Sequence, residues 1–325
     1  MADVITQFEW KMILDRIEER RCVPFLGAAV NISSNGYEGL PLGEQVAISL
    51  VRELLGLKAG EEPTDLAQVT THEKLVAAGL DKDLARIALK NLPRVALHAE
   101  MAAHGDYDYF LKLLKGIIPD YKRKPSKLLK TIAALPLRLI VTTNYDRLLE
   151  VALDESDNKD NYRLVVQPIN GFDEGSSLPA LMEWLPTYEG VTVYKIHGTF
   201  SEQPGNGQTN DPGRIIVTED DYIHFLTVIG KENEGVPNSI KEKLVDSTLL
   251  FLGYSLEDWD FRTLHKGLIE GLAPHVQRAS FAIQKDPPEF LRDFWRKKGV
   301  TIYDIDVHQF ADDLEQRWND RVAGR

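Results

Sequence analysis

Short runs of almost continuously apolar residues recur along this chain, and several of them end in small or polar residues. A run of four to six such residues, bounded by turn residues, is typical of a strand buried on both faces of a parallel sheet. Between most of these runs the apolar residues follow helical spacing, so strands and helices alternate. The predicted strands are 22–26, 138–143, 191–196, 214–217, 248–253, 280–284 and 300–305. The alternation predicts a doubly wound, Rossmann-like α/β fold with a mainly parallel sheet.

The remaining segments predict helices and loops around this sheet. Residues 7–20 carry apolar side chains at helical spacing, and 41–134 is helical in pattern without a strand candidate. We therefore expect one domain over 1–325 with an inserted helical subdomain at about 41–134. Residues 154–161 and 201–213 have loop composition. The second loop follows a predicted strand end, where it either walls a site or is an ordinary surface excursion.

Composition narrows the possible functions. A formal charge of −12 argues against direct nucleic-acid binding, and the basic stretch 121–124 is interpreted as a solvated turn. The single cysteine, Cys22, excludes an intramolecular disulfide and a multi-cysteine zinc site, and its apolar surroundings predict a buried thiol. The histidines lack the paired spacing of zinc ligands, so no catalytic metal is expected. No apolar stretch approaches the roughly 20 residues of a membrane span and no signal peptide is recognisable, which predicts a cytoplasmic protein.

Four predicted strands end in segments suited to ligand binding: 26–29, 142–146, 196–198 and 252–256. In a doubly wound sheet, ligands bind beyond the carboxyl ends of strands. The small-residue turn at 27–29 would let backbone N–H groups approach a pyrophosphate, although Ala29 stands where the dinucleotide-binding motif has its second glycine. A simple helix–strand packing turn would have the same composition. No P-loop motif occurs, which excludes a P-loop NTPase.

Two of these strand ends bring together an amide, a carboxylate and an imidazole. Asn144 and Asp146 follow one strand, and His197 follows another about fifty residues later, a separation of one crossover with its loops. A histidine followed by glycine is often structural on its own. Together with Asn-x-Asp at a second strand end, it is a candidate acid–base site.

Taken in order, these segments resemble the sirtuin superfamily, and more closely its bacterial sirtuin-like branch of NADases associated with antiphage defence. The matching segments are 25–29, 142–146, 195–198, 218–222 and 251–258. The resemblance implies that Gly27 and Ala28 lie beneath the NAD pyrophosphate, and that Asn144 orients the nicotinamide ribose or the attacking water. It also implies that Asp146 holds the nicotinamide carboxamide and that His197 is the general base. The other implied NAD contacts are Ala29 and Thr143, with Gly253, Ser255 and Leu256 around the adenosine half.

The activity implied by the resemblance is hydrolysis of NAD to ADP-ribose and nicotinamide, as an NAD-depleting antiphage effector without a metal. Nicotinamide leaves as a neutral molecule, so the barrier lies in an oxocarbenium-like cation that Asn144 and His197 would help to form and trap. The single cysteine and the helical insertion disfavour a zinc-containing deacylase. Deacylation, ADP-ribosyl transfer and a non-catalytic NAD- or ADP-ribose-binding role remain alternatives. Ala29, and Asn31 where sirtuins often carry serine, depart from the family pattern.

An unrestrained NAD hydrolase would kill its host, so we expect its activity to await a trigger. The chain has no recognisable sensor domain. The resemblance therefore implies control by a homo-oligomer, or by a separately encoded HerA-type hexameric motor ATPase or Argonaute-like protein. The helical faces at 7–20 and 81–103 are candidate oligomer surfaces, although core packing explains them equally well. The sequence leaves open the trigger and whether cyclic ADP-ribose is a product.

Overall fold

The centre of the molecule is a seven-stranded sheet in which every described strand pairing is parallel. The computed structural model describes residues 4–34, 36–54, 91–158, 161–170, 188–200, 214–229, 231, 235–269 and 279–324. The strands are β1 (Cys22–Leu26), β2 (Leu139–Thr142), β3 (Tyr162–Val166), β4 (Val191–Lys195), β5 (Thr248–Leu252), β6 (Ser280–Ile283) and β7 (Val300–Tyr303). Their order across the sheet is β3-β4-β2-β1-β5-β6-β7. The predicted doubly wound parallel fold is confirmed.

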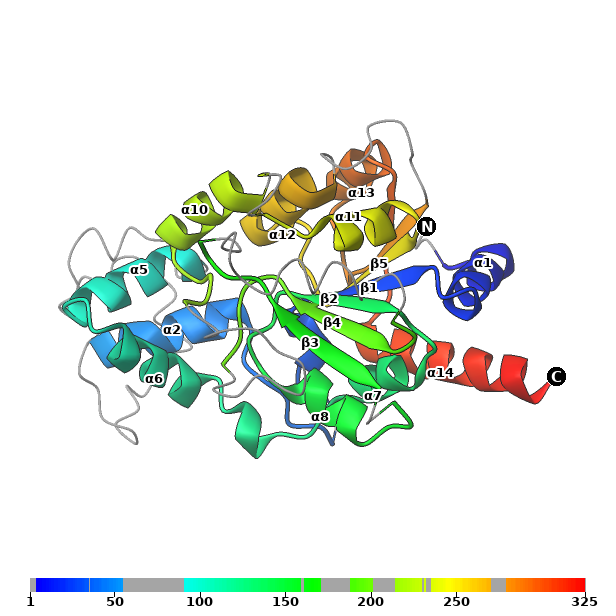
Figure 1. Cartoon of the computed structure of the whole chain (residues 1–325), viewed down its shortest axis with the longest axis horizontal. Helices are drawn as coiled ribbons and strands as arrows, with labels where there is room; N and C mark the ends of the chain where they lie inside the picture. The colour runs from blue at the N-terminus through cyan, green and yellow to red at the C-terminus, as the bar shows by residue number, and fades with distance from the viewer. Residues whose placement is uncertain are drawn as a thin grey trace.

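Helices cover both faces of the sheet, as Figure 1 shows. One face packs against α10 (Glu219–Ile229), α11 (Asn238–Val245), α12 (Trp259–Leu264) and α13 (Glu289–Arg296), and the other against α1 (Gln7–Glu18), α7 (Lys127–Ala134), α8 (Leu148–Asp154) and α14 (Val307–Ala323). Alternation along each strand divides the core between these layers. In β1, Val23 and Phe25 point into the first layer, while Cys22 and Leu26 point into the second. The predicted burial of Cys22 is confirmed.

Three further helices gather at the end of the molecule away from both termini (Figure 1). These are α2 (Gly43–Leu54), α5 (Leu92–Ala102) and α6 (Tyr107–Ile117), which pack on one another, and α5 also contacts α10. Within the described part of 41–134 the elements are helical, as the pattern indicated. α7, at the end of that stretch, packs on α8 and α14 under the sheet. The boundaries of the insertion stay a prediction.

The first helix shows how local chemistry sets an element boundary. Thr6 caps α1 by accepting a hydrogen bond from the Glu9 N–H at 3.2 Å, and the Glu9 carboxylate accepts one from the Thr6 N–H at 2.8 Å. Trp10 on its buried face stacks against Phe310 of α14, with ring centroids 5.3 Å apart. Among the described residues, no helix combines the length and apolarity needed to cross a membrane.

Two strand assignments made from the sequence differ from the structure. The predicted strand at 214–217 is wrong: this buried segment joins no ladder, because the Ile215 N–H bonds to the Tyr107 hydroxyl and the Ile216 N–H to the His197 carbonyl. The sequence analysis also missed β3, an edge strand that is only half-buried at its start. The predicted loop at 201–213 and residues 81–90 of one proposed oligomer surface lie outside the described residues.

Candidate functional site

The registers of the central strands align the four candidate segments at one edge of the sheet. Leu26 of β1 pairs with both Thr142 of β2 and Leu252 of β5, and Thr142 pairs with Lys195 of β4. The segments that follow these residues therefore leave the sheet side by side, at its carboxyl edge. This edge is the position at which doubly wound folds bind ligands.

The turns after β1 and β5 interlock through two glycines. Gly253 has φ +76°, and a Cβ there would lie 2.5 Å from the Val30 nitrogen. A Cβ on Gly27 would lie 2.6 Å from the Gly253 carbonyl oxygen, so neither position has room for a side chain. The N–H groups of Gly27 and Ala29 donate to the carbonyls of Leu252 and Gly253, at 2.9 and 3.0 Å. Both amides are therefore already engaged within the protein, whereas Ala28 between them is exposed.

Asn144 is held against the turn after β1. Its Nδ2 donates to the Gly27 carbonyl at 3.1 Å, and its backbone N–H donates to Thr142 Oγ1 at 3.0 Å. The Thr142 hydroxyl in turn donates to the Leu26 carbonyl at 2.9 Å. The half-buried amide therefore bridges the ends of β2 and β1 in a fixed orientation.

Asp146 is a buried carboxylate, with 7% of its surface exposed. One of its oxygens accepts hydrogen bonds from the Leu148 N–H at 2.9 Å and from Asn31 Nδ2 at 3.4 Å. Burial raises the pKa of this carboxyl to about 6, although the nearby Lys195 ammonium opposes the shift. Asn31, noted as a departure from the sirtuin pattern, is thus a direct partner of a predicted site residue.

His197 lies beneath α10 and is 1% exposed. The rings of Tyr222 and Phe225 on that helix meet its imidazole edge-on, with centroids 5.3 and 5.4 Å away. Burial lowers the pKa of His197 to about 3, so the ring is neutral at pH 7. Within the described part of the chain, its Nε2 has no hydrogen-bond partner.

Asn144 and His197 stand at the tips of neighbouring strands, but their side chains take different directions. The Asn144 amide nitrogen turns towards β1, while the His197 ring turns towards α10. The turns that carry them are joined through Ile216, whose carbonyl accepts from the Tyr145 hydroxyl at 2.6 Å and whose N–H donates to the His197 carbonyl at 3.0 Å.

Comparison with known proteins agrees with this architecture. The sequence profile of the SIR2-like domain matches residues 138–303, just over half of the chain. This chain belongs to the SIR2-like family. The matched region runs from the residue before β2 to the end of β7, and so contains the Asn144 and His197 strand ends but not the Gly27 turn.

Two proteins similar in sequence to this chain are both named NAD(+) hydrolase ThsA. The protein from Acinetobacter baumannii is 29% identical over 140 residues, which cover 42% of this chain and 23% of the relative. The protein from Bacillus cereus is 25% identical over 185 residues, which cover 56% of this chain and 33% of the relative. The matches therefore leave most of each relative uncovered.

The turn after β5 of this SIR2-like domain is largely built into the core. Leu256 is fully buried, its N–H donates to Gln284 Oε1 at 3.0 Å, and its carbonyl accepts from Trp295 Nε1 at 3.1 Å. Ser255 beside it is half-buried, and its carbonyl accepts from the Asp258 N–H at 3.0 Å. Leu256 therefore faces the protein interior and holds the turn in place through its backbone hydrogen bonds.

The sequence analysis overlooked Tyr254 in the same turn. A Cβ on Gly27 would lie 2.8 Å from its ring, so the ring packs directly over that glycine. The Tyr254 hydroxyl donates to the Leu26 carbonyl at 3.1 Å and accepts from Thr143 Oγ1 at 3.2 Å. Tyr254 therefore links three of the four strand ends. The sequence feature that could have revealed it is its position directly after Gly253.

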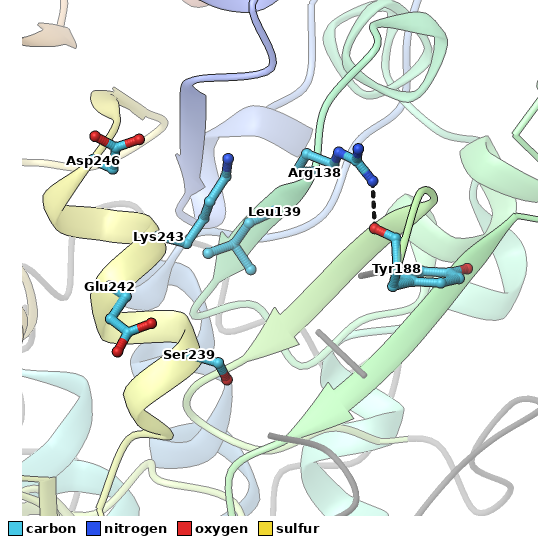
Figure 2. Close-up of a pocket in the computed structure, with 7 residues that line it drawn as sticks. All are labelled: Arg138, Leu139, Tyr188, Ser239, Glu242, Lys243 and Asp246. Atoms are coloured by element: carbon cyan, nitrogen blue, oxygen red, sulfur yellow. Dashed lines mark hydrogen bonds between the residues drawn. The ribbon is translucent and has the colours of Figure 1, made fainter. Parts of the chain in front are cut away.

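A hollow of about 360 Å³ lies at the opposite, amino edge of the SIR2-like sheet (Figure 2). Its lining includes Arg138 just before β2 and Asp246 just before β5, together with Lys243 of α11. Arg138 donates to the Tyr188 carbonyl beside it. None of the predicted site residues lines this hollow. Among the described residues, no group of three or more His, Cys, Asp or Glu side chains is placed to hold a metal.

Proposed function

We propose that this SIR2-like protein hydrolyses NAD at the nicotinamide–ribose bond, releasing ADP-ribose and nicotinamide. The observation that carries the proposal is the buried Nε2 of His197, which has no partner among the described residues and stands one strand away from Asn144. Buried polar atoms are nearly always hydrogen-bonded, so an orphan at the carboxyl edge points to a ligand that supplies the missing bond. The names of the two relatives support NAD as that ligand.

In this proposal the two ends of nicotinamide riboside are held by different groups. Asp146 accepts a hydrogen bond from the nicotinamide carboxamide, and its ionised form makes this bond stronger than its protonated form does. The neutral His197 accepts one from a ribose hydroxyl through Nε2. Gly27 and Gly253 let the turns after β1 and β5 pack closely against each other, and the exposed Ala28 of the first turn is the point at which the pyrophosphate is proposed to approach the backbone.

Bond cleavage then proceeds without a metal, because nicotinamide departs as a neutral molecule with the bonding electron pair. The positive charge passes to the ribose, and water attacks the anomeric carbon. Because the Asn144 Nδ2 is occupied by the Gly27 carbonyl, Oδ1 is the atom proposed to orient this water. As the new bond forms, the water passes its proton by way of the ribose hydroxyl to Nε2 of His197, the proposed general base. A correctly placed base contributes about 10²–10⁴-fold to such a step.

We further propose that this activity is held back in the isolated chain and serves NAD depletion in antiphage defence. The aromatic cover of α10 over His197 supports a resting state. Activation would come from assembly with further copies, or with a HerA-type ATPase or an Argonaute-like protein. The cover also favours the second candidate function, a non-catalytic NAD- or ADP-ribose-binding subunit.

Product analysis by liquid chromatography separates these functions. Wild type is incubated with NAD, alone and with each activator candidate, and compared with Asn144→Ala, His197→Ala and His197→Asn of verified fold. His224→Ala is the matched control, since His224 lies exposed on α10. With an effective activator present, we expect equal amounts of ADP-ribose and nicotinamide from wild type and the control, and none from the other variants. Turnover by folded Asn144→Ala at the wild-type rate would overturn the mechanism, and NAD binding without turnover in every condition would establish the non-catalytic role.

A further inference from the structure

A buried ion pair lies directly beneath the candidate site, and neither of its members has a role in the mechanism above. Lys195 is the last residue of β4, two residues before His197, and its side chain is 0% exposed. Glu150 on α8 is 4% exposed, and its Oε1 lies 2.7 Å from Lys195 Nζ. Lysine and glutamate are rarely so deeply buried, so this pair requires an explanation.

The Lys195 ammonium lies among three oxygen atoms of the surrounding elements. It donates to the Asp146 carbonyl, contacts Thr199 Oγ1 at 3.4 Å, and pairs with Glu150. An ammonium has three N–H donors and no acceptor, so this environment matches its capacity. Lys195 thereby ties the end of β4 to the turn after β2.

The same two turns are joined again next to this contact. The Tyr145 carbonyl accepts a hydrogen bond from the Phe200 N–H at 2.9 Å and from Thr199 Oγ1 at 3.3 Å. The relative position of the Asn144–Asp146 turn and the His197 turn therefore depends on the side chain of Lys195 and its neighbours. A displacement here would move both proposed catalytic groups at once.

Stability alone does not account for this pair. Apart from the Lys195 ammonium, no group of the described residues donates a hydrogen bond to either Glu150 oxygen, so the charge of Glu150 is balanced by the Lys195 ion pair. Burying two charges is costly, and well-packed apolar residues of similar volume often replace such pairs without loss of stability. The feature that apolar residues could not supply is a fixed charge and a fixed contact to the Asp146 carbonyl.

We propose that Lys195 and Glu150 are a positioning pair for NAD cleavage, which sets the Asn144–Asp146 turn against His197 and places a positive charge beside the Asp146 carboxylate. The role rests on the proposed function, since it acts through residues assigned to NAD. Neither member touches the substrate in this scheme.

The charges around Asp146 predict in which direction its pKa changes when either member of the pair is replaced. Lys195 on β4 lowers the pKa of the Asp146 carboxyl, while Glu150 on α8 and Asp120 raise it. On the remaining side stand Asn31, which donates to the carboxylate, and the Tyr37 hydroxyl, whose own pKa Asp146 raises. Loss of the lysine charge should therefore move the pKa of Asp146 up, and loss of the glutamate charge should move it down.

Three variants test the pair: Lys195→Met, the double variant Lys195→Met/Glu150→Met, and Glu150→Gln. Lys195→Met leaves the Glu150 carboxylate buried without its counter-charge and should lower the melting temperature. The double variant removes both charges at similar side-chain volume and should restore the melting temperature. We expect the folded double variant to lose kcat on the order of 10²-fold, with its acid limb of kcat/KM shifted to higher pH. Glu150→Gln should shift that limb to lower pH. A folded double variant with wild-type kcat and pH profile would overturn the proposal.

A second measurement separates failure of this proposal from failure of the proposed function. The Asp146 carboxyl is titrated by NMR in protein labelled with ¹³C-aspartate, with Asp146→Asn for assignment, in wild type and Glu150→Gln. A lower Asp146 pKa in Glu150→Gln supports the electrostatic role even if wild type leaves NAD intact. An unchanged titration in a protein that does cleave NAD refutes the pair and leaves the activity standing.

Discussion

Replacing Gly253 with alanine tests whether the turns after β1 and β5 interlock as the structure indicates. Its φ of +76° is unfavourable for any residue with a Cβ, at about 1–2 kcal/mol. The new methyl group would also lie 2.5 Å from the Val30 nitrogen and 2.9 Å from the Gly27 carbonyl oxygen, both backbone atoms that cannot rotate away. Overpacking of this kind costs about 1–3 kcal/mol, so the two effects together should remove about 2–5 kcal/mol of stability.

Gly105 provides the matched control, because its φ is +81° and nothing lies within 4 Å of the position that a methyl group would take there. Gly105→Ala should therefore cost only the backbone part, about 1–2 kcal/mol. Urea unfolding followed by circular dichroism gives both values under the same conditions. Equal losses in the two variants would show that the turn at Gly253 has room to spare, and would refute the close approach on which the proposed dinucleotide contact depends.

Three further predictions concern the titration of His197 and Asp146, the hydroxyl of Tyr254, and the Thr6 cap of α1. Burial lowers the pKa of His197 from 6.5 to about 3, so this residue makes stability fall as pH drops through that window, by up to about 1.4 kcal/mol per pH unit. Burial raises the pKa of Asp146 from 3.8 to about 6, so it makes stability fall as pH rises between those values. The two effects on the free energy of unfolding oppose each other between about pH 4 and 6. In urea unfolding, the free energy of unfolding should therefore rise with pH in Asp146→Asn and fall with pH in His197→Asn. Parallel pH profiles of the two variants would contradict the assigned pKa shifts. Tyr254→Phe should keep the ring over Gly27 but lose about 1 kcal/mol with the hydroxyl, measured by urea unfolding, and a neutral result would discount those bonds. Thr6→Ala should cost about 1 kcal/mol through its lost cap and leave NAD turnover unchanged, so a turnover defect would connect α1 to the site.

The sequence predicted the strands that are buried on both faces of the sheet. The strands at 22–26 and 248–253 were recognisable because every side chain in β1 and β5 is buried. β3 was not, since Tyr162 and Arg163 at its start are half-buried, as an edge strand permits. The segment 214–217 was misassigned for the converse reason: it is apolar and largely buried, but side chains and a loop carbonyl satisfy its amides.

The candidate site shows the same division between pattern and packing. Connectivity alone brought Asn144 and His197 to neighbouring strand ends, because parallel strands in one sheet share a carboxyl edge. The direction of each side chain depends on what packs above it, and the sequence holds no simple sign of α10 covering the imidazole. Glu150 is a similar case, since a lone glutamate in a short helix ordinarily faces solvent. Only the packing of α8 under the sheet reveals its pairing with Lys195.

Burial gives this strand edge an electrostatic character suited to the proposed reaction. Burial keeps His197 neutral. The carboxylate of Asp146 is largely ionised at pH 7, because this pH lies above its pKa of about 6. The charges buried together are then two carboxylates, Asp146 and Glu150, against the single ammonium of Lys195. This cluster is negative by one unit, in a region where water screens little. The pyridinium ring of NAD carries the positive charge before cleavage, and that charge moves to the ribose as nicotinamide leaves. The fixed negative charge lowers the barrier to the extent that it attracts the ribose cation more strongly than the pyridinium ring of the bound substrate, because uniform attraction to both would only strengthen binding.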